Sequence, residues 1–103
     1  MRVYIAGPMT GRPDWNQDAF NDAEKYLTEL GYEAVNPARH GFGDETMTWE
    51  DYARLGLIDL LTCRAVVVLP GWHASKGATL EVFVARSLNM PVWHLETVEA
   101  LQQ

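Results

Sequence analysis

The sequence predicts an α/β fold in which helices cover both faces of a parallel β-sheet. Two observations lead to this prediction. Short apolar runs alternate with helical patterns along all 103 residues, and the run AVVVLP at 65–70 is apolar without interruption. Alternation of this kind is typical of βαβ units with right-handed crossovers, and a continuous apolar run is typical of a strand buried on both faces. At this length we expect one domain, residues 1–103.

The first half of the chain is expected to contribute two strands and one helix. The β-branched and aromatic run RVYIA at 2–6 predicts the first strand, and a loop rich in glycine and proline follows it. Apolar residues then recur at helical spacing over 15–30, and Gly31 closes this helix as a C-terminal cap. YEAVNP at 32–37 predicts the second strand. Residues 38–47 show no periodicity and predict a loop long enough to act as a lid.

The second half repeats the pattern around the apolar strand described above. A second helix is expected over 48–61, with Thr48 as N-cap and an acid three residues later that completes a capping box. A third helix follows over 75–88. MPVWHL at 90–95 predicts the fourth strand, and residues 96–103 predict a short last helix.

The composition excludes several classes of function. A net charge of −6 argues against binding to a nucleic-acid polymer, and no stretch approaches the ~20 apolar residues of a membrane span. The N-terminus lacks a signal-peptide pattern, so we expect a cytoplasmic protein. The single cysteine, Cys63, has no partner for a disulfide and is expected to be a small buried residue. The three histidines lack metal-ligand spacing, and we expect neither a metal nor a cofactor.

Ligands of parallel sheets bind at the carboxyl ends of the strands, where helix N-termini offer free N–H donors. The loops expected there are GPMTG at 7–11, NPARH at 36–40 and PGWHASKG at 70–77. Glycines of the first loop let the backbone approach a phosphate or carboxylate, and Arg12 adds a cation, although the same loop would also serve as a plain strand-to-helix turn. The candidate substrate-binding residues of these loops are Gly7, Pro8, Met9, Gly11, Arg12, Asn36, Gly71, Trp72, Ser75, Lys76 and Gly77.

The loop before the third helix suggests an anion site. Lys76 falls at the first helical position, where a cation opposes the helix dipole, and a bound anion would remove that conflict. Ser75 is placed to cap the helix or to donate to the same anion, and Gly77 leaves room for a ligand. The alternative is a capped surface helix with an exposed lysine.

Glu81 is the main candidate for chemistry. Its helical neighbours three and four residues away are glycine, alanine and valine, so its face is small and apolar and is expected to turn toward the sheet. Partial dehydration there would raise the pKa of the carboxyl group and suit it to act as a nucleophile or proton carrier. Tyr4, on the first strand, is placed to present its hydroxyl to Glu81. The alternatives are a glutamate at an exposed helix edge and a tyrosine in the core.

Further candidates lie around these loops. Asp59 is a lone acid in an apolar part of the second helix, either a site residue or part of a solvated stripe. His73 is either an exposed loop residue or a proton donor to a leaving group. Trp15, Trp49 and Trp72 fall near the loop end of the sheet, where they either pack in the core or stack a flat base.

The segments YIAGPMTG, NPA, LPGW, SKGATLE and VA, in this order, resemble the nucleoside 2-deoxyribosyltransferase-like family, in particular its short phage and bacterial members. The resemblance covers nearly the whole chain. It implies a flavodoxin-like or Rossmann-like three-layer sandwich with four to five parallel strands, assembled as a homo-oligomer (a dimer or higher) with a site near a subunit boundary. It also implies cleavage or transfer at the N-glycosidic bond of a deoxynucleoside or its 5′-monophosphate.

The resemblance also assigns roles to single residues. Glu81 matches the family's catalytic glutamate, which attacks the anomeric carbon of the sugar and holds it as a glycosyl ester. Tyr4 matches a tyrosine that orients this glutamate. Gly7 matches a glycine of the substrate loop, and Ser75 matches a residue near the 5′ hydroxyl or phosphate.

Two positions depart from the family pattern. Relatives usually carry an aspartate on the second helix and another at the start of the third strand, and here those positions are Gly56 and Arg64. Asp59 lies one helical turn after Gly56 and is the residue that would take over the role of the first aspartate.

Two other functions are compatible with the sequence. One is a module that binds a nucleotide or a nucleotide-derived signal without turning it over, which the departure at the aspartate positions favours. The other is a phosphoribohydrolase of the cytokinin-activating type, because the PGGxGTxxE loop of such enzymes is similar to PGWHASKGATLE here. Fold alone does not choose between these functions.

Overall fold

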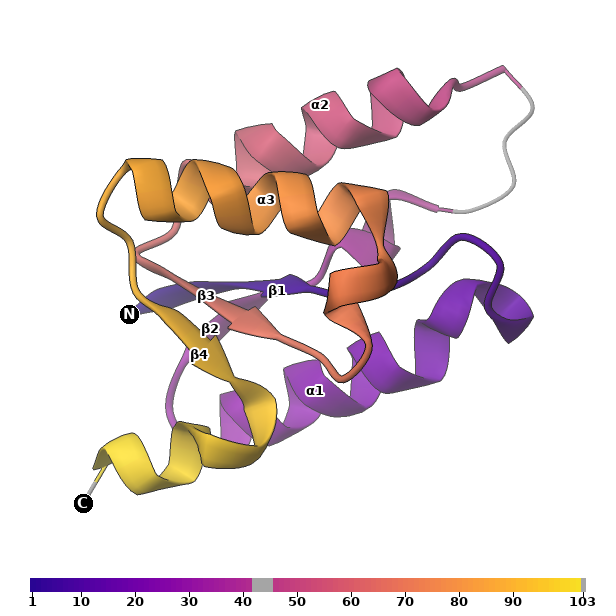
Figure 1. Ribbon diagram of the computed structural model, residues 1–103. Coiled ribbons are helices and arrows are strands. Elements are labelled where there is room, and N and C mark those ends of the chain that lie inside the picture. Colours follow the sequence, from indigo (N-terminus) through magenta and orange to yellow (C-terminus); the bar gives the residue numbers. More distant parts are fainter. Residues whose placement is uncertain (42–45, 103) are drawn as a thin grey trace.

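A computed structural model describes residues 1–41 and 46–102 of the chain. Within them, four strands form one parallel sheet in the order β2-β1-β3-β4 (Figure 1). The strands are β1 (Arg2–Ala6), β2 (Glu33–Val35), β3 (Ala65–Val68) and β4 (Val92–His94). The predicted α/β fold with a parallel sheet is therefore confirmed, and the four strands lie where the apolar runs predict them.

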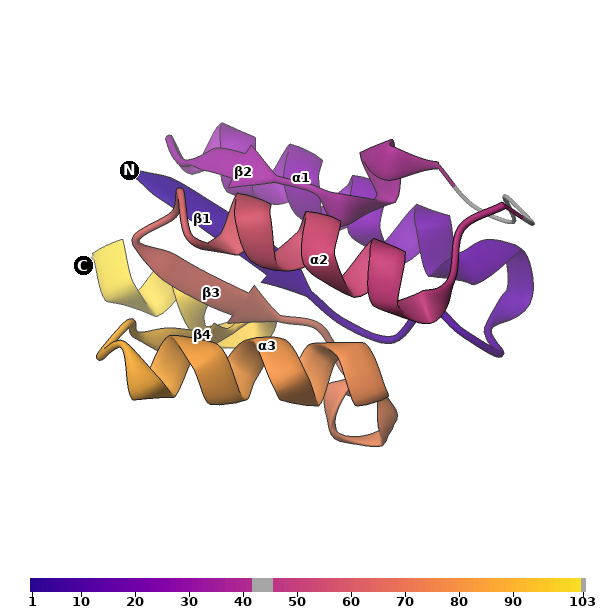
Figure 2. The same ribbon diagram turned by 90° about the horizontal axis from the view of Figure 1, so that it is seen from above.

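Helices cover both faces of the sheet (Figures 1 and 2). Helix α1 (Gln17–Glu29) lies on one face, and α2 (Trp49–Leu60) and α3 (Lys76–Ser87) lie side by side on the other. Side chains alternate between the two layers along β1, where Val3 and Ile5 pack toward α1 and Tyr4 and Ala6 pack toward α2 and α3. All of β3 is buried, as an uninterrupted apolar strand requires.

The start of α1 differs from the expectation. The helical pattern predicts a helix from residue 15, but the helix begins at Gln17, after a 3-10 turn at Pro13–Asn16. Trp15 has a φ of 56°, and its two neighbours are also left-handed. Left-handed residues cannot continue a right-handed helix, so Trp15 lies in the turn before α1 and is not part of its helical face.

The end of α1 agrees with the expectation. Gly31 has a φ of 96°, which glycine adopts without a steric penalty. Its N–H donates to the carbonyl of Thr28 at 3.0 Å, and the N–H of Tyr32 donates to the carbonyl of Leu27 at 3.0 Å. These two bonds form a Schellman motif, which satisfies the last carbonyls of the helix.

The predicted N-caps of α2 and α3 are confirmed. The Thr48 hydroxyl accepts the N–H of Asp51 at 3.1 Å, and the Asp51 carboxylate accepts the N–H of Thr48 at 2.9 Å, which completes the capping box. The Ser75 hydroxyl accepts the N–H of Ala78 at 3.1 Å, so α3 begins at Lys76 as expected. Both helix N-termini are thereby held at the carboxyl end of the sheet.

Two connections complete the chain. The segment expected to form a lid begins with a 3-10 turn at Pro37–His40, and its residues 42–45 lie outside the described residues. After β4, the expected short last helix is present as a 3-10 helix at Leu95–Gln102. None of the helices in the described part of the chain combines the length and the apolar character that crossing a membrane would require.

Candidate active site

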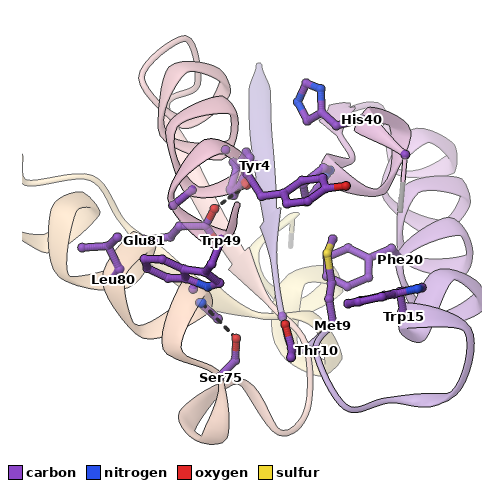
Figure 3. A pocket seen from close by; sticks show the side chains of 18 residues that line it. Tyr4, Met9, Thr10, Trp15, Phe20, His40, Trp49, Ser75, Leu80 and Glu81 are labelled. Carbon is purple, nitrogen blue, oxygen red and sulfur yellow. Dashed lines mark hydrogen bonds between the residues drawn. The ribbon is translucent and has the colours of Figure 1, made fainter. Parts of the chain in front are cut away.

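A pocket lies at the carboxyl end of β1, bounded by α2 and α3 on one side and by the loop after β1 on the other (Figure 3). Its wall contains small residues that let the backbone approach the cavity, and large aromatic and apolar ones. The small residues are Gly7, Gly41, Ala53, Gly56, Gly77 and Ala78. The large ones are Met9, Trp15, Phe20, Trp49, Tyr52 and Leu80. This position is where an open parallel sheet ordinarily binds its ligand.

Tyr4 and Glu81 meet on the α3 side of the pocket. The Tyr4 hydroxyl donates to Oε2 of Glu81 at 2.5 Å, a short hydrogen bond to a carboxylate. Helix α2 brings Gly56 against this pair, and a Cβ at residue 56 would lie 2.6 Å from Oε2 of Glu81 and 2.8 Å from the Tyr4 hydroxyl. Only glycine leaves the space that the hydrogen-bonded pair occupies.

The surroundings of Glu81 perturb its ionisation. Burial raises the pKa of Glu81 from 4.5 to about 7, and the hydrogen bond from Tyr4 opposes the rise. Burial and the nearby carboxylate raise the pKa of Tyr4 well above its ordinary value, so its hydroxyl keeps its proton and remains a donor. A carboxylate that is half ionised near neutral pH is suited to nucleophilic or proton-transfer chemistry.

Aromatic side chains lie across the pocket from Glu81. Figure 3 shows Glu81, Leu80 and Trp49 along one side, and Met9, Phe20 and Trp15 along the other. Trp15 reaches this wall because the left-handed turn before α1 takes it out of the helix. Such walls accept a flat apolar ring between them.

The two side chains expected to bind an anion at the N-terminus of α3, Ser75 and Lys76, both contact other groups of the protein. The Ser75 hydroxyl caps the helix, and the ammonium group of Lys76 lies 3.9 Å from the centre of the Trp49 ring. This cation–π contact holds the cation that otherwise opposes the helix dipole. Ser75 lines the pocket, whereas Lys76 is absent from its described wall.

His40 and Asp59 form a second polar pair at the pocket. Nε2 of His40 lies 2.5 Å from Oδ2 of Asp59, and the two side chains are 30% and 27% exposed. His40 lines the pocket, whereas Asp59 lies behind it, outside the described wall. The structure thus does not bring Asp59 to Glu81, but to the histidine that follows β2.

The structure brings together some of the predicted site residues and separates others. Those that line the pocket are Tyr4, Gly7, Met9, Ser75, Gly77 and Glu81. Those outside its described wall are Pro8, Gly11, Arg12, Asn36, Asp59, Gly71, Trp72 and Lys76. Two of the separated residues, Arg12 and Gly71, lie against each other. A Cβ at residue 71 would be 2.6 Å from Nη2 of Arg12.

Asn36 and Trp72 follow strands at the carboxyl end of the sheet, but their side chains have structural contacts and do not line the pocket. The buried Asn36 caps the 3-10 turn by accepting the N–H of Ala38 at 2.9 Å, and its amide donates to Asn21 and Glu24 on α1. Trp72 is buried in the core beneath α3, and its ring lies 3.9 Å from that of His73. Both side chains are therefore used to hold the loops in place.

The structure adds three pocket residues, His40, Tyr52 and Ala53, to which the sequence patterns give no role. On α2, positions 49, 52, 53 and 56 follow the spacing of one helix face, and all four line the pocket. That spacing is the signal in the sequence that identifies this face. Among the described residues, no group of three or more His, Cys, Asp or Glu side chains is arranged to hold a metal ion.

Comparisons with known proteins give two findings. The sequence matches the family described as Domain of unknown function (DUF4406) over residues 1–94. Among solved structures, a 2-deoxyribosyltransferase from the psychrotolerant bacterium Bacillus psychrosaccharolyticus is similar, with a TM-score of 0.72 and 18% sequence identity, over 91% of this chain and 71% of that one. No match was found among curated proteins. The structural likeness supports the flavodoxin-like fold.

Proposed function

This chain belongs to the DUF4406 family, and we propose that it breaks or transfers the N-glycosidic bond of a deoxynucleoside or deoxynucleoside 5′-monophosphate. The observation that carries the proposal is the 2.5 Å hydrogen bond between Tyr4 and Glu81 inside a pocket with aromatic walls. Glu81 is the nucleophile, and Tyr4 positions it. The 2-deoxyribosyltransferase with the same fold supports this reaction class by analogy.

The proposed chemistry follows that of retaining glycosidases. A Glu81 oxygen attacks the anomeric carbon as the bond to the base breaks, and the sugar becomes a glycosyl ester. Water then releases the sugar, or a second base accepts it. Tyr4 holds Oε2 in place, so the carboxylate does not need to reorient before it attacks.

The aromatic walls are suited to the base of the substrate. Trp15, Phe20 and Met9 lie across the pocket from Glu81, at the side where a base would project from a sugar held near the carboxylate (Figure 3). Stacking of a flat ring on such side chains contributes about 1–3 kcal/mol. The glycines and alanines near Glu81 leave space for the sugar.

The second candidate is a module that binds the nucleoside or nucleotide without turning it over. Gly56 favours this candidate, because the aspartate usual in the nucleoside 2-deoxyribosyltransferase-like family is missing at this position. A side chain at residue 56 would also collide with Glu81. A phosphoribohydrolase of the cytokinin-activating type is a third candidate, which differs by requiring ribose 5-phosphate in the substrate.

We also propose that the chain forms a homo-oligomer. Large apolar side chains are exposed on the outer surfaces of α2 and α3 and at their ends, and burial against another copy would remove them from water. They are Ile58, Leu61, Phe83 and Leu88. Light scattering would give the mass in solution; a monomer at all concentrations would contradict the proposal.

The experiment that tests the reaction uses deoxynucleosides, their 5′-monophosphates and the ribose counterparts, each with and without a second free base. Base release and exchange are followed by chromatography for the wild type and for Glu81→Gln and Glu81→Ala. Turnover that both variants lose supports Glu81 as nucleophile, and the panel identifies the sugar and the phosphate requirement. Saturable binding without any turnover would refute the reaction and favour the binding module.

A further inference from the structure

The second polar pair of the pocket suggests how the leaving base is assisted. Expelling a base as an anion is unfavourable, so N-glycosidic cleavage is accelerated when an acid protonates the base as it departs. Glu81 is committed to the sugar in the proposed reaction, and the Tyr4 hydroxyl already donates to it. Another side chain has to supply the proton.

Helix α2 has no room for an acid beside Glu81. A Cβ at Gly56 would approach both Oε2 of Glu81 and the Tyr4 hydroxyl to less than 3 Å, so a carboxylate at this position would displace the pair. The acid nearest to this position in the helix is Asp59, three residues later, and its carboxylate contacts His40 instead of the cavity.

His40 connects that acid to the pocket. It ends the 3-10 turn after β2, lines the cavity and places Nε2 2.5 Å from Oδ2 of Asp59. A carboxylate in this position fixes the orientation and tautomer of an imidazole, which directs the other ring nitrogen to a separate partner. Imidazole is also the side chain most often used for proton transfer near neutral pH.

We propose that His40, positioned by Asp59, is the general acid that protonates the leaving base, and that this pair takes the place of an α2 aspartate beside the nucleophile. The inference rests on the proposed function. As the bond between the anomeric carbon and the base nitrogen breaks, its electron pair stays with the base, which takes a proton from the His40 imidazolium. The neutral imidazole then removes a proton from the attacking water or the incoming base, and Glu81 leaves as a carboxylate.

The test compares two leaving groups. One substrate is a deoxynucleoside with an ordinary base, and the other is 4-nitrophenyl 2-deoxyriboside, whose nitrophenolate departs without protonation. In His40→Gln, kcat/KM for the deoxynucleoside is expected to fall by about 10²- to 10⁴-fold. The kcat/KM for release of nitrophenolate, which covers only the steps up to the glycosyl ester, is expected to stay within a few-fold of the wild type, because the departure of nitrophenolate needs no acid. Asp59→Asn is expected to show the same selectivity with a smaller loss.

His73→Gln is the matched control, since His73 is exposed and lies outside the described pocket wall. It should leave both rates unchanged. Equal losses for the two leaving groups in His40→Gln, or a selective loss in His73→Gln, would overturn the assignment of His40 while the proposed function stands. A wild type that releases neither leaving group would overturn the proposed function and this inference together. Unfolding midpoints close to that of the wild type establish that the variants are folded.

Discussion

Gly56 and Glu81 are in contact across the interface between α2 and α3, so closely that a Cβ at residue 56 would lie 2.6 Å from Oε2 of Glu81. The contact explains why α2 carries a glycine in the middle of a helix, where glycine costs about 1 kcal/mol relative to alanine. The Tyr4 hydroxyl and the Glu81 carboxylate, which are hydrogen-bonded to each other, occupy the space that glycine leaves. The geometry of the candidate nucleophile therefore depends on a residue that carries no functional group.

Gly56→Ala is expected to displace the carboxylate and to lower kcat/KM by at least about 10-fold, because the hydrogen bond from Tyr4 is lost or lengthened. The gain in helix propensity of about 1 kcal/mol should be offset by overpacking of about 1–3 kcal/mol. Activity assays and chemical denaturation would measure the two effects.

Gly77→Ala serves as the matched control for stability in this comparison. A Cβ at Gly77 meets no atom nearer than 4.0 Å, so the free energy of unfolding should rise by about 0.5–1 kcal/mol. A gain of the same size in Gly56→Ala, with unchanged activity, would contradict the close contact.

The pH dependence of activity should report the ionisation of Glu81. A nucleophilic carboxylate has to be deprotonated, and burial raises the pKa of Glu81 to about 7. With 4-nitrophenyl 2-deoxyriboside, whose leaving group needs no acid, kcat/KM is expected to increase with pH through about 7 and then to level off, because the pKa of Glu81 is raised. An increase centred near the ordinary glutamate pKa would refute the assignment of a desolvated Glu81 as the nucleophile.

Tyr4→Phe removes the donor that lowers the pKa of Glu81. The pKa should therefore rise above its wild-type value, and the increase of kcat/KM with pH should move to higher pH. A hydrogen bond to a charged group contributes about 1.5–3 kcal/mol, so activity on the plateau should fall by about 10- to 100-fold. A pH profile that superimposes on the wild-type profile would show that the bond does not act on Glu81.

The stability of the fold should also respond to Glu81. Its pKa is about 7 in the folded chain against 4.5 in the unfolded chain, so the folded state binds the proton more tightly. The free energy of unfolding should then fall as pH rises between about 4.5 and about 7, by about 3 kcal/mol at most.

Glu81→Gln isolates this effect because the amide does not ionise. Relative to the wild type, the variant should be more stable at pH 8 than at pH 4.5, by on the order of 1–3 kcal/mol in chemical denaturation. A difference between the two proteins that does not change with pH would show that Glu81 titrates as it does in the unfolded chain.

Thr48→Ala tests the capping box that holds the N-terminal end of α2 at the pocket. Loss of the bond from the Asp51 N–H to the Thr48 hydroxyl should lower the free energy of unfolding by about 0.5–2 kcal/mol. Thr48→Ser keeps the acceptor and should remain within about 0.5 kcal/mol of the wild type. Equal losses in the two variants would show that the hydroxyl does not cap the helix.

Much of the fold could be predicted from local patterns. The apolar run at 65–70 predicts the buried β3. Gly31, Thr48 and Ser75 mark helix ends because the capping bond of each involves a residue three positions away. Glu81 stands out for the same reason, since its small apolar neighbours lie one helical turn from it. The left-handed turn at Trp15 was not predicted, because the helical pattern continues across it.

The sequence by itself determined the strands, the helix caps and the identity of Glu81 as the acid on a buried helix face, because hydrophobic periodicity and capping act within a few residues. The tertiary structure decided which groups meet. Tyr4 and Glu81 are 77 positions apart, and only the packing of α3 over β1 sets their separation at 2.5 Å. The same packing puts Gly56 against that pair and Asp59 on His40, because contacts between layers depend on how the helices are placed on the sheet and not on spacing along the chain.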